Sequence, residues 1–184
     1  MPASRPAIIL LHFKTNPETL PCLDSLVSAR KVSDFATYII AVQSVEPGLL
    51  APPSFQVGGI QYVAALSSDF KSFMLPAGAI PGVQSRPAKP GETIILYGVG
   101  FGGVTPSLSA GTLVSQQNTL SNPIEIRFGN VAVTLSFAGL APGATGLYQF
   151  NLVVPNVPDN PAVPLTLSLT GAIPSQTLFI AVQH

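Results

Sequence analysis

Charged residues are scarce in this chain. Only 9% of its 184 residues are charged, whereas a soluble globular domain usually carries about 25%. Eight Lys and Arg residues balance eight Asp and Glu residues, and the basic ones are scattered. Because binding to nucleic acid or anionic lipid needs clustered basic side chains, we expect no nucleic-acid partner. The surface must instead be built from Ser, Thr, Asn, Gln and Gly.

Cysteine and long apolar runs are nearly missing too. The single cysteine, Cys22, cannot form a disulfide within one chain and leaves the redox compartment open. No run approaches the roughly 18 apolar residues that span a bilayer, so we expect no membrane span. Residues 7–11 (AIILL) are interrupted by His12 and Lys14 and make a poor signal peptide. A secreted origin would require an N-terminus upstream of Met1.

Proline and glycine, by contrast, are abundant. The chain holds 19 Pro and 16 Gly, and 47% of its residues are hydrophobic. With so few charges, this composition favours short strands separated by turns over long helices, so we predict an all-β fold. Residues 1–35 are the exception. Asn16-Pro17-Glu18 resembles a helix start, but Pro21 follows closely, so we expect a poorly defined segment with at most a short helix.

A short repeat suggests how the remaining chain is divided. Residues 37–43 (TYIIAVQ) and 177–183 (TLFIAVQ) agree at five of seven positions, as two closing strands of similar modules would. Residues 36–55 are then the closing strand and linker of a truncated module, and residues 56–184 are a complete one. Chance similarity of two apolar strands is the alternative. An orphaned strand must satisfy its edge, so we expect residues 36–43 to be paired, either on the complete module or by self-association.

Alternating apolar residues predict the strands of the complete module. The clearest signal is a hairpin in which Gly129-Asn130 forms a two-residue turn able to hold positive φ. Residues 104–123 are mostly polar and are expected to be a surface excursion. The predicted strands are residues 60–66, 73–75, 92–97, 124–128, 131–137, 147–154, 165–170 and 177–182.

The stretch around Tyr148 indicates how the strands are stacked. In immunoglobulin-type sandwiches a tyrosine near the start of the sixth strand donates its hydroxyl to a backbone group a few residues upstream, and a core residue follows two positions later. Tyr148, two residues after Gly146, fits the tyrosine, and Phe150 fits the core residue. We therefore predict an immunoglobulin-like antiparallel β-sandwich.

Three segments also support a family resemblance. They read PGLLAPPSF (residues 47–55), PGETIILYGVGFG (90–102) and PIEIRFGNVAVTLSFAGLAPGATGLYQFNLVVP (123–155). Together they resemble the C-terminal Ig-like domain of large secreted acidobacterial proteins of the Solibacter type, and the second also resembles the opening strand of IPT/TIG domains. The resemblance covers residues 36–184. It implies an Ig-like sandwich on an exported protein and no established catalytic residues.

The main functional hypothesis is a non-catalytic extracellular spacer or adhesion module that contacts protein or carbohydrate at a cell surface. For a carbohydrate-binding or other ligand-contacting module, the aromatic candidates near turns are Tyr62, Phe70, Phe73 and Phe101.

A small hydrolase of esters, lactones or glycosides is the rival hypothesis. It would use His12 with a Ser or carboxylate, with Asp24 or Asp34 as the orienting partner. The chain lacks the Gly-x-Ser-x-Gly elbow that exposes a nucleophile in α/β-hydrolases.

No cofactor or metal is expected. The glycines of residues 98–103 are followed by strands and lack a neighbouring Lys, so they predict tight turns and not a phosphate loop. Asp69 and Asp159 are the weak candidates for a calcium site in a loop, Asp159 with Asn160 beside it.

Overall fold

The computed structural model describes residues 8–13, 30–32, 35–41, 45–170 and 176–184. Contacts divide the chain into two compact units, Met1–Ser44 and Val45–His184. No helix among the described residues is long and apolar enough to span a bilayer.

The first unit contains a three-stranded antiparallel sheet. Its strands are β1 (Ile8–Phe13), β2 (Arg30–Val32) and β3 (Phe35–Ala41), in the order β1-β3-β2. The predicted strand at residues 36–43 is thus paired, as expected, and its partners among the described residues are β1 and β2. Parts of residues 1–35 are strands, whereas the predicted helix start at Asn16 lies outside the described residues.

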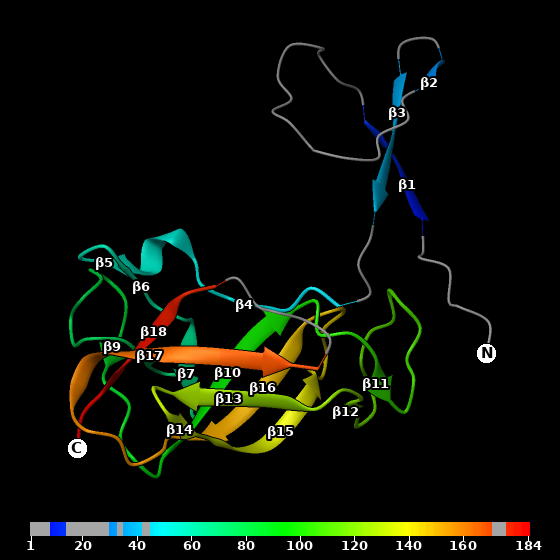
Figure 1. Cartoon of the computed structure of the whole chain (residues 1–184). Helices are drawn as coiled ribbons and strands as arrows, with labels where there is room; N and C mark the ends of the chain where they lie inside the picture. Colours follow the sequence, from blue (N-terminus) through cyan, green and yellow to red (C-terminus); the bar gives the residue numbers. More distant parts are fainter. Residues whose placement is uncertain (1–7, 14–29, 33–34, 42–44, 171–175) are drawn as a thin grey trace. The chain divides into compact units, whose positions relative to one another are not determined.

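The second unit is a β-sandwich (Figure 1). Its larger sheet has seven strands in the order β15-β16-β10-β7-β8-β9, with β4 also paired to β10. The strands are β4 (Gly48–Leu49), β7 (Ala65–Ser67), β8 (Phe73–Met74), β9 (Ser85–Arg86), β10 (Thr93–Val99), β15 (Thr134–Leu140) and β16 (Tyr148–Val153).

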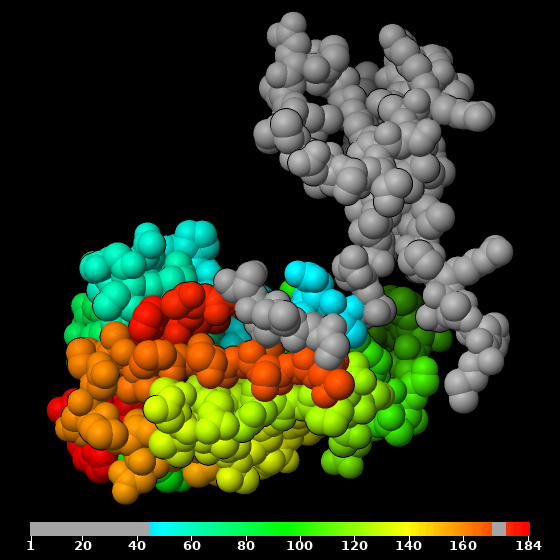
Figure 2. Space-filling model, viewed as in Figure 1, coloured from blue at the N-terminus to red at the C-terminus, as the bar shows by residue number. Residues whose placement is uncertain are grey.

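The smaller sheet has four strands in the order β14-β13-β17-β18. They are β13 (Ile124–Phe128), β14 (Val131–Ala132), β17 (Asn160–Leu169) and β18 (Leu178–Val182). Side chains of β17 (orange) and β13 (lime green) lie against one another along the face seen in Figure 2. The hairpins β5 (Gln56–Val57) with β6 (Ile60–Gln61) and β11 (Val104–Thr105) with β12 (Thr119–Leu120) and the 3-10 turn η1 (Pro53–Phe55) complete the unit.

The core lies between the two sheets. Its fully buried residues include Leu96 and Phe150 from the larger sheet and Ile126 and Phe128 from the smaller one. A second, smaller cluster forms around Phe55. Residues 45–55, expected to be a linker, therefore contribute to the interior of the unit. The predicted all-β sandwich is confirmed.

The predicted hairpin at Gly129-Asn130 is present, but the strand after it changes sheets. Phe128 pairs with Val131 across the two-residue turn, and Gly129 has a φ of +58°. The Val133 N–H still donates to the Ile126 carbonyl, at 2.9 Å, whereas Thr134 already pairs with Val153 of the larger sheet. The single strand predicted over residues 131–137 is thus wrong, because the chain crosses between sheets at Val133.

Two other predicted strands differ substantially from the structure. The strand expected at residues 60–66 is split into β6 and β7, and β17 begins at Asn160, five residues earlier than expected, because a register shift between Asn160 and Val163 accommodates the proline between them. The excursion predicted over residues 104–123 contains β11 and β12, and it buries Val114 and Asn118.

Two side-chain amides bind exposed stretches of strand backbone as a neighbouring strand would. Asn118 accepts from the Leu140 N–H (2.6 Å) and donates to the Leu140 carbonyl (3.2 Å). Gln176 accepts from the Leu49 N–H (2.8 Å) and donates to its carbonyl (3.0 Å). Because unpaired strand edges recruit other chains, these contacts close part of the edges of β15 and β4.

The first and last residues of the second unit bind the loops on either side of β10. The Glu46 N–H donates to the Gly100 carbonyl, in the loop after β10, at 2.9 Å, and the Gln183 N–H donates to the Ala88 carbonyl, in the loop before it, also at 2.9 Å. Figure 1 shows the start of the unit, in cyan beside β4, and the C-terminus on opposite sides of the sandwich.

Candidate functional site

Tyr148 binds the backbone of the loop that follows β10. It begins β16 after Gly146, whose φ is +67°, and its phenol donates to the carbonyl oxygen of Gly102, 46 positions upstream. The expected partner only a few residues upstream is therefore wrong. The ring is buried, and this burial raises the pKa of Tyr148. The hydroxyl pins the loop that follows β10 onto the start of β16.

Aromatic packing surrounds this contact. The Phe101 ring centroid lies 5.3 Å from that of Tyr148 and 4.7 Å from that of Phe150. Phe150 is fully buried, as expected for the residue two positions after Tyr148. A Cβ on Gly98 would lie 2.6 Å from the Phe101 ring, so the absence of a side chain there makes room for Phe101. Phe101 is thus part of the core and not a surface contact.

The other three aromatic candidates fall into two classes. Tyr62 is buried and donates its hydroxyl to the Pro161 carbonyl at 3.0 Å, while Phe73 packs edge-on against Phe55 at 4.9 Å. Phe70 alone among the four is exposed, at 57%. Its φ of 59° is a left-handed conformation that costs a bulky residue free energy.

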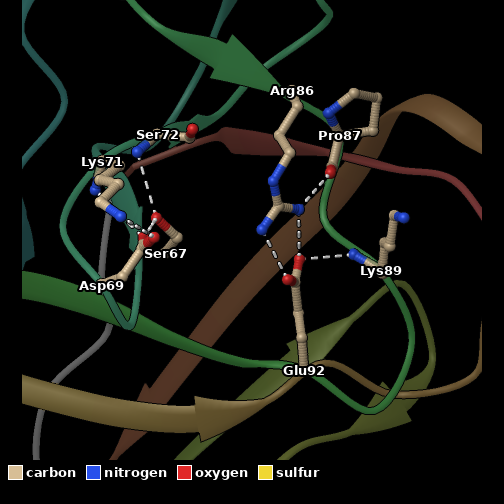
Figure 3. A network of polar contacts seen from close by, with 8 residues as sticks. All are labelled: Ser67, Asp69, Lys71, Ser72, Arg86, Pro87, Lys89 and Glu92. Carbon is tan, nitrogen blue, oxygen red and sulfur yellow. Dashed lines mark hydrogen bonds and ion pairs between the residues drawn. The ribbon is translucent and has the colours of Figure 1, made fainter.

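A turn network holds the backbone around Phe70 (Figure 3). The Asp69 carboxylate accepts from the Ser67 hydroxyl (2.6 Å) and from the Lys71 N–H (3.2 Å), and the Ser67 hydroxyl accepts from the Ser72 N–H (3.1 Å). The hydrogen bond from Ser67 is the main reason that the pKa of Asp69 is lowered. These bonds fix the turn between β7 and β8 and present the Phe70 ring to solvent.

A bidentate ion pair joins Arg86 to Glu92 (Figure 3). The guanidinium donates two bonds to the carboxylate, at 2.9 and 2.7 Å, and one to the Pro87 carbonyl, and the Lys89 N–H donates to Glu92 at 2.6 Å. Burial disfavours the ionised Glu92, but the bonds from Arg86 and Lys89 outweigh it and lower its pKa. The network clamps the loop that leads into β10.

A third polar cluster lies where the chain leaves the unit. Asp159 accepts from the backbone N–H of His184 at 3.0 Å and lies 2.5 Å from its Nδ1, while His184 Nε2 lies 3.0 Å from Asn156 Oδ1. The side-chain bond to His184 lowers the pKa of Asp159.

The two candidate residues for a calcium site, Asp69 and Asp159, therefore lie on different elements of the fold. Asp69 lies in the β7–β8 turn beside the ammonium group of Lys71, at 3.6 Å, and Asp159 precedes β17. Within the described ranges, no three His, Cys, Asp or Glu side chains come together as metal ligands would.

The hydrolase candidates lie in the first unit. His12 is on β1 with Thr37 as its cross-strand neighbour, and Asp24 and Asp34 lie outside the described residues.

The structure also brings together a group that sequence reasoning missed. Tyr97 of β10, Phe137 of β15, and Gln149 and Asn151 of β16 all point away from the core, because their strand neighbours Leu96, Ala138 and Phe150 face into it. We call these four residues the aromatic–amide face. Each of them is partly exposed, and burial raises the pKa of Tyr97.

Comparison with known proteins gives no relative. No family model, no curated protein and no solved structure matches the chain. The assignment of fold class therefore depends on the strands and sheets described above, and the function has to be argued from the surfaces.

The aromatic–amide face could not be read from the sequence because it depends on register across three strands. Tyr97 opposes Gln149, and Phe137 opposes Asn151. The register of β15 also contains a shift between Leu135 and Phe137. Alternation alone marks Gln149 and Asn151 as outward-facing, and that was the only signal available.

Proposed function

We propose that the Val45–His184 unit is a non-catalytic extracellular Ig-like module that acts as a structural spacer or adhesion domain of an exported bacterial protein. The observation that carries this proposal is that Glu46 binds Gly100, in the loop after β10, whereas Gln183 binds Ala88, in the loop before it. A unit arranged in this way holds the segments before and after it apart by at least the length of a strand, about 20 Å.

Rigidity supports the same function. The core between the sheets is continuous, Tyr148 and the Arg86–Glu92 pair fasten the main loops, and Asn118 and Gln176 close strand edges. A spacer needs such internal contacts because it must keep its length when force is applied to its ends. The neutral polar surface suits an extracellular location, since few charges limit nonspecific binding to charged polymers.

The rival hypothesis, a small hydrolase that uses His12, is tested by comparing the turnover of the full chain with that of a His12→Ala variant. The full chain and its His12→Ala variant would be incubated with chromogenic esters, lactones and glycosides under identical conditions. We expect both proteins to give the same background rate as buffer. Turnover by the full chain that is lost in His12→Ala would overturn the non-catalytic function.

A further inference from the structure

The aromatic–amide face has an ordered arrangement across three neighbouring strands. Gln149 lies between Tyr97 of β10 and Gly139 of β15, its two cross-strand neighbours, and Asn151 lies between Ile95 and Phe137. Strands in a sheet are about 4.8 Å apart, so the row from β10 to β15 spans about 10 Å.

The Phe137 ring lies over the position that a side chain at Gly139 would occupy. A Cβ built on Gly139 would be 3.2 Å from the Phe137 ring and 2.7 Å from two oxygen atoms of Asn118. The ring is therefore drawn along β15 toward the cross-strand neighbour of Gln149. Gln149 is flanked by an aromatic residue on either side, and Asn118 borders the row at the sheet edge.

A hydrogen bond between the side-chain amides of Gln149 and Asn151 fixes the orientation of both. Gln149 Nε2 donates to Asn151 Oδ1, at 2.8 Å. Within the described part of the chain, Gln149 Oε1 and Asn151 Nδ2 have no further protein partner. The acceptor atom Gln149 Oε1 and the donor group at Asn151 Nδ2 thus remain at neighbouring positions of a fixed pair, which suits a ligand with adjacent hydroxyl groups.

The face carries no charge. The strands β10 (TIILYGV), β15 (TLSFAGL) and β16 (YQFNLV) contain no Asp, Glu, Lys or Arg. An anionic polymer would find no cation here, and a charged peptide would find no complementary group. The chemistry that remains is apolar contact with flat rings, combined with hydrogen bonds from neutral amides.

We infer that the aromatic–amide face binds a neutral polysaccharide, with C–H faces of sugar rings on Tyr97 and Phe137 and hydroxyl groups on Gln149 and Asn151. This inference deepens the adhesion part of the proposed function and rests on it. Sugar rings combine apolar faces with rows of hydroxyls, which matches the alternation of rings and amides along the row.

The test is affinity electrophoresis of the full chain through gels that contain a neutral polysaccharide: mixed-linkage β-glucan, hydroxyethylcellulose, xylan or galactomannan. Polygalacturonate serves as the anionic comparison. We expect retardation by at least one neutral polymer and none by polygalacturonate. Tyr97→Ala and Gln149→Ala should each weaken the retardation constant by about tenfold, which corresponds to the loss of one good aromatic or hydrogen-bonding contact.

Matched control variants distinguish a loss of binding at this face from a loss of folding and from binding elsewhere on the surface. Gln56→Ala removes an exposed amide on β5, and Phe70→Ala removes the exposed ring at the β7–β8 turn, so both should bind as the parent does. Unfolding midpoints are measured for every variant. If Tyr97→Ala is poorly folded, Gln149→Leu, which keeps a side chain of similar size, decides the question.

Three results would overturn the inference. One is no retardation by any neutral polymer, and another is retardation that Phe70→Ala abolishes but Tyr97→Ala and Gln149→Leu leave unchanged. The third is a concentration-dependent dimer in sedimentation that Tyr97→Ala dissociates, since the face would then bind a second copy of the chain. The turnover comparison with His12→Ala is independent, so failure of sugar binding and failure of the non-catalytic function are distinguishable.

Discussion

The phenol of Tyr148 donates a hydrogen bond to the carbonyl oxygen of Gly102, a residue 46 positions earlier in the chain. The contact links the start of β16 to the loop that follows β10, two strands that are already neighbours in the larger sheet. The hydroxyl therefore acts on the loop between β10 and β11 more than on the pairing of the strands.

Removing this hydroxyl should destabilise the unit without changing the fold. Tyr148→Phe keeps the ring and leaves the Gly102 carbonyl without its partner, so we expect the free energy of unfolding to fall by about 1–2 kcal/mol. Urea unfolding measures the difference. Tyr97→Phe, which removes a hydroxyl from the outer face, is the control and should change stability by less than about 0.5 kcal/mol. Equal effects of the two substitutions would contradict the role given to Tyr148.

The attachment of residues 45–47 depends on Gly100. Gly100 and Gly111 have almost the same φ, +80° and +79°, but a Cβ on Gly100 would lie 1.9 Å from the Glu46 carbonyl oxygen, whereas one on Gly111 meets no atom within 4 Å. Gly111→Ala should cost about 1–2 kcal/mol from backbone strain alone. Gly100→Ala should cost about 1–3 kcal/mol more, because the entering chain must move. Thermal unfolding of the pair gives the comparison, and equal losses would show that the Glu46 contact is unimportant.

Phe70 is expected to hold strain that glycine would release. Its φ of 59° costs a residue with a side chain about 1–2 kcal/mol, and the entropy that glycine loses on folding offsets part of the gain. Phe70→Gly should therefore raise the free energy of unfolding by about 0.5–1 kcal/mol. Phe70→Ala removes the same ring but keeps the strain and should give no gain. If both substitutions change the free energy of unfolding equally, the change comes from loss of the ring and not from relief of backbone strain.

The Arg86–Glu92 pair should make stability depend on pH in the acidic range. The pKa of Glu92 is lowered from its ordinary value of 4.5, so its contribution is fully present above that value and is lost as the pH falls through the lower, folded-state pKa. At pH 7, Glu92→Gln should cost about 1–2 kcal/mol, with allowance for solvent screening of this partly exposed pair.

The measurement is urea unfolding of the parent and Glu92→Gln between pH 7 and pH 3. The difference between the two proteins should shrink as the pH falls below about 4.5. Because Asp69 and Asp159 remain in both proteins, their own titration cancels in the difference. A gap that stays constant over this range would show that the ionised carboxylate adds nothing to stability.

Local patterns predicted the parts of the fold that are set by neighbouring residues. The alternation of Ile124, Ile126 and Phe128 and the turn at Gly129-Asn130 gave the β13–β14 hairpin correctly. The crossing at Val133 was missed because Val131, Val133 and Leu135 continue the same alternation through it. Nothing in that pattern distinguishes one long strand from two short ones in different sheets.

The same local patterns did not predict contacts between residues that are far apart in the sequence. Burial of Phe150 was predicted from its distance to Tyr148 in the sequence, but the partner of the Tyr148 hydroxyl lies on another loop. Asn118 reads as one more polar residue of a surface excursion, yet it is buried against Leu140. The aromatic–amide face likewise exists only once the registers of β10, β15 and β16 are known.

One distance measurement tests whether the second unit keeps its first residues, at Glu46, apart from its last, at Gln183. Spin labels would be attached to cysteines in place of the exposed residues Glu46 and Gln183 in a full-length Cys22→Ser background. Double electron–electron resonance should give one narrow distance distribution centred beyond about 20 Å, the length of β10. A distribution centred well below that length, or one spread over many distances, would contradict the spacer account.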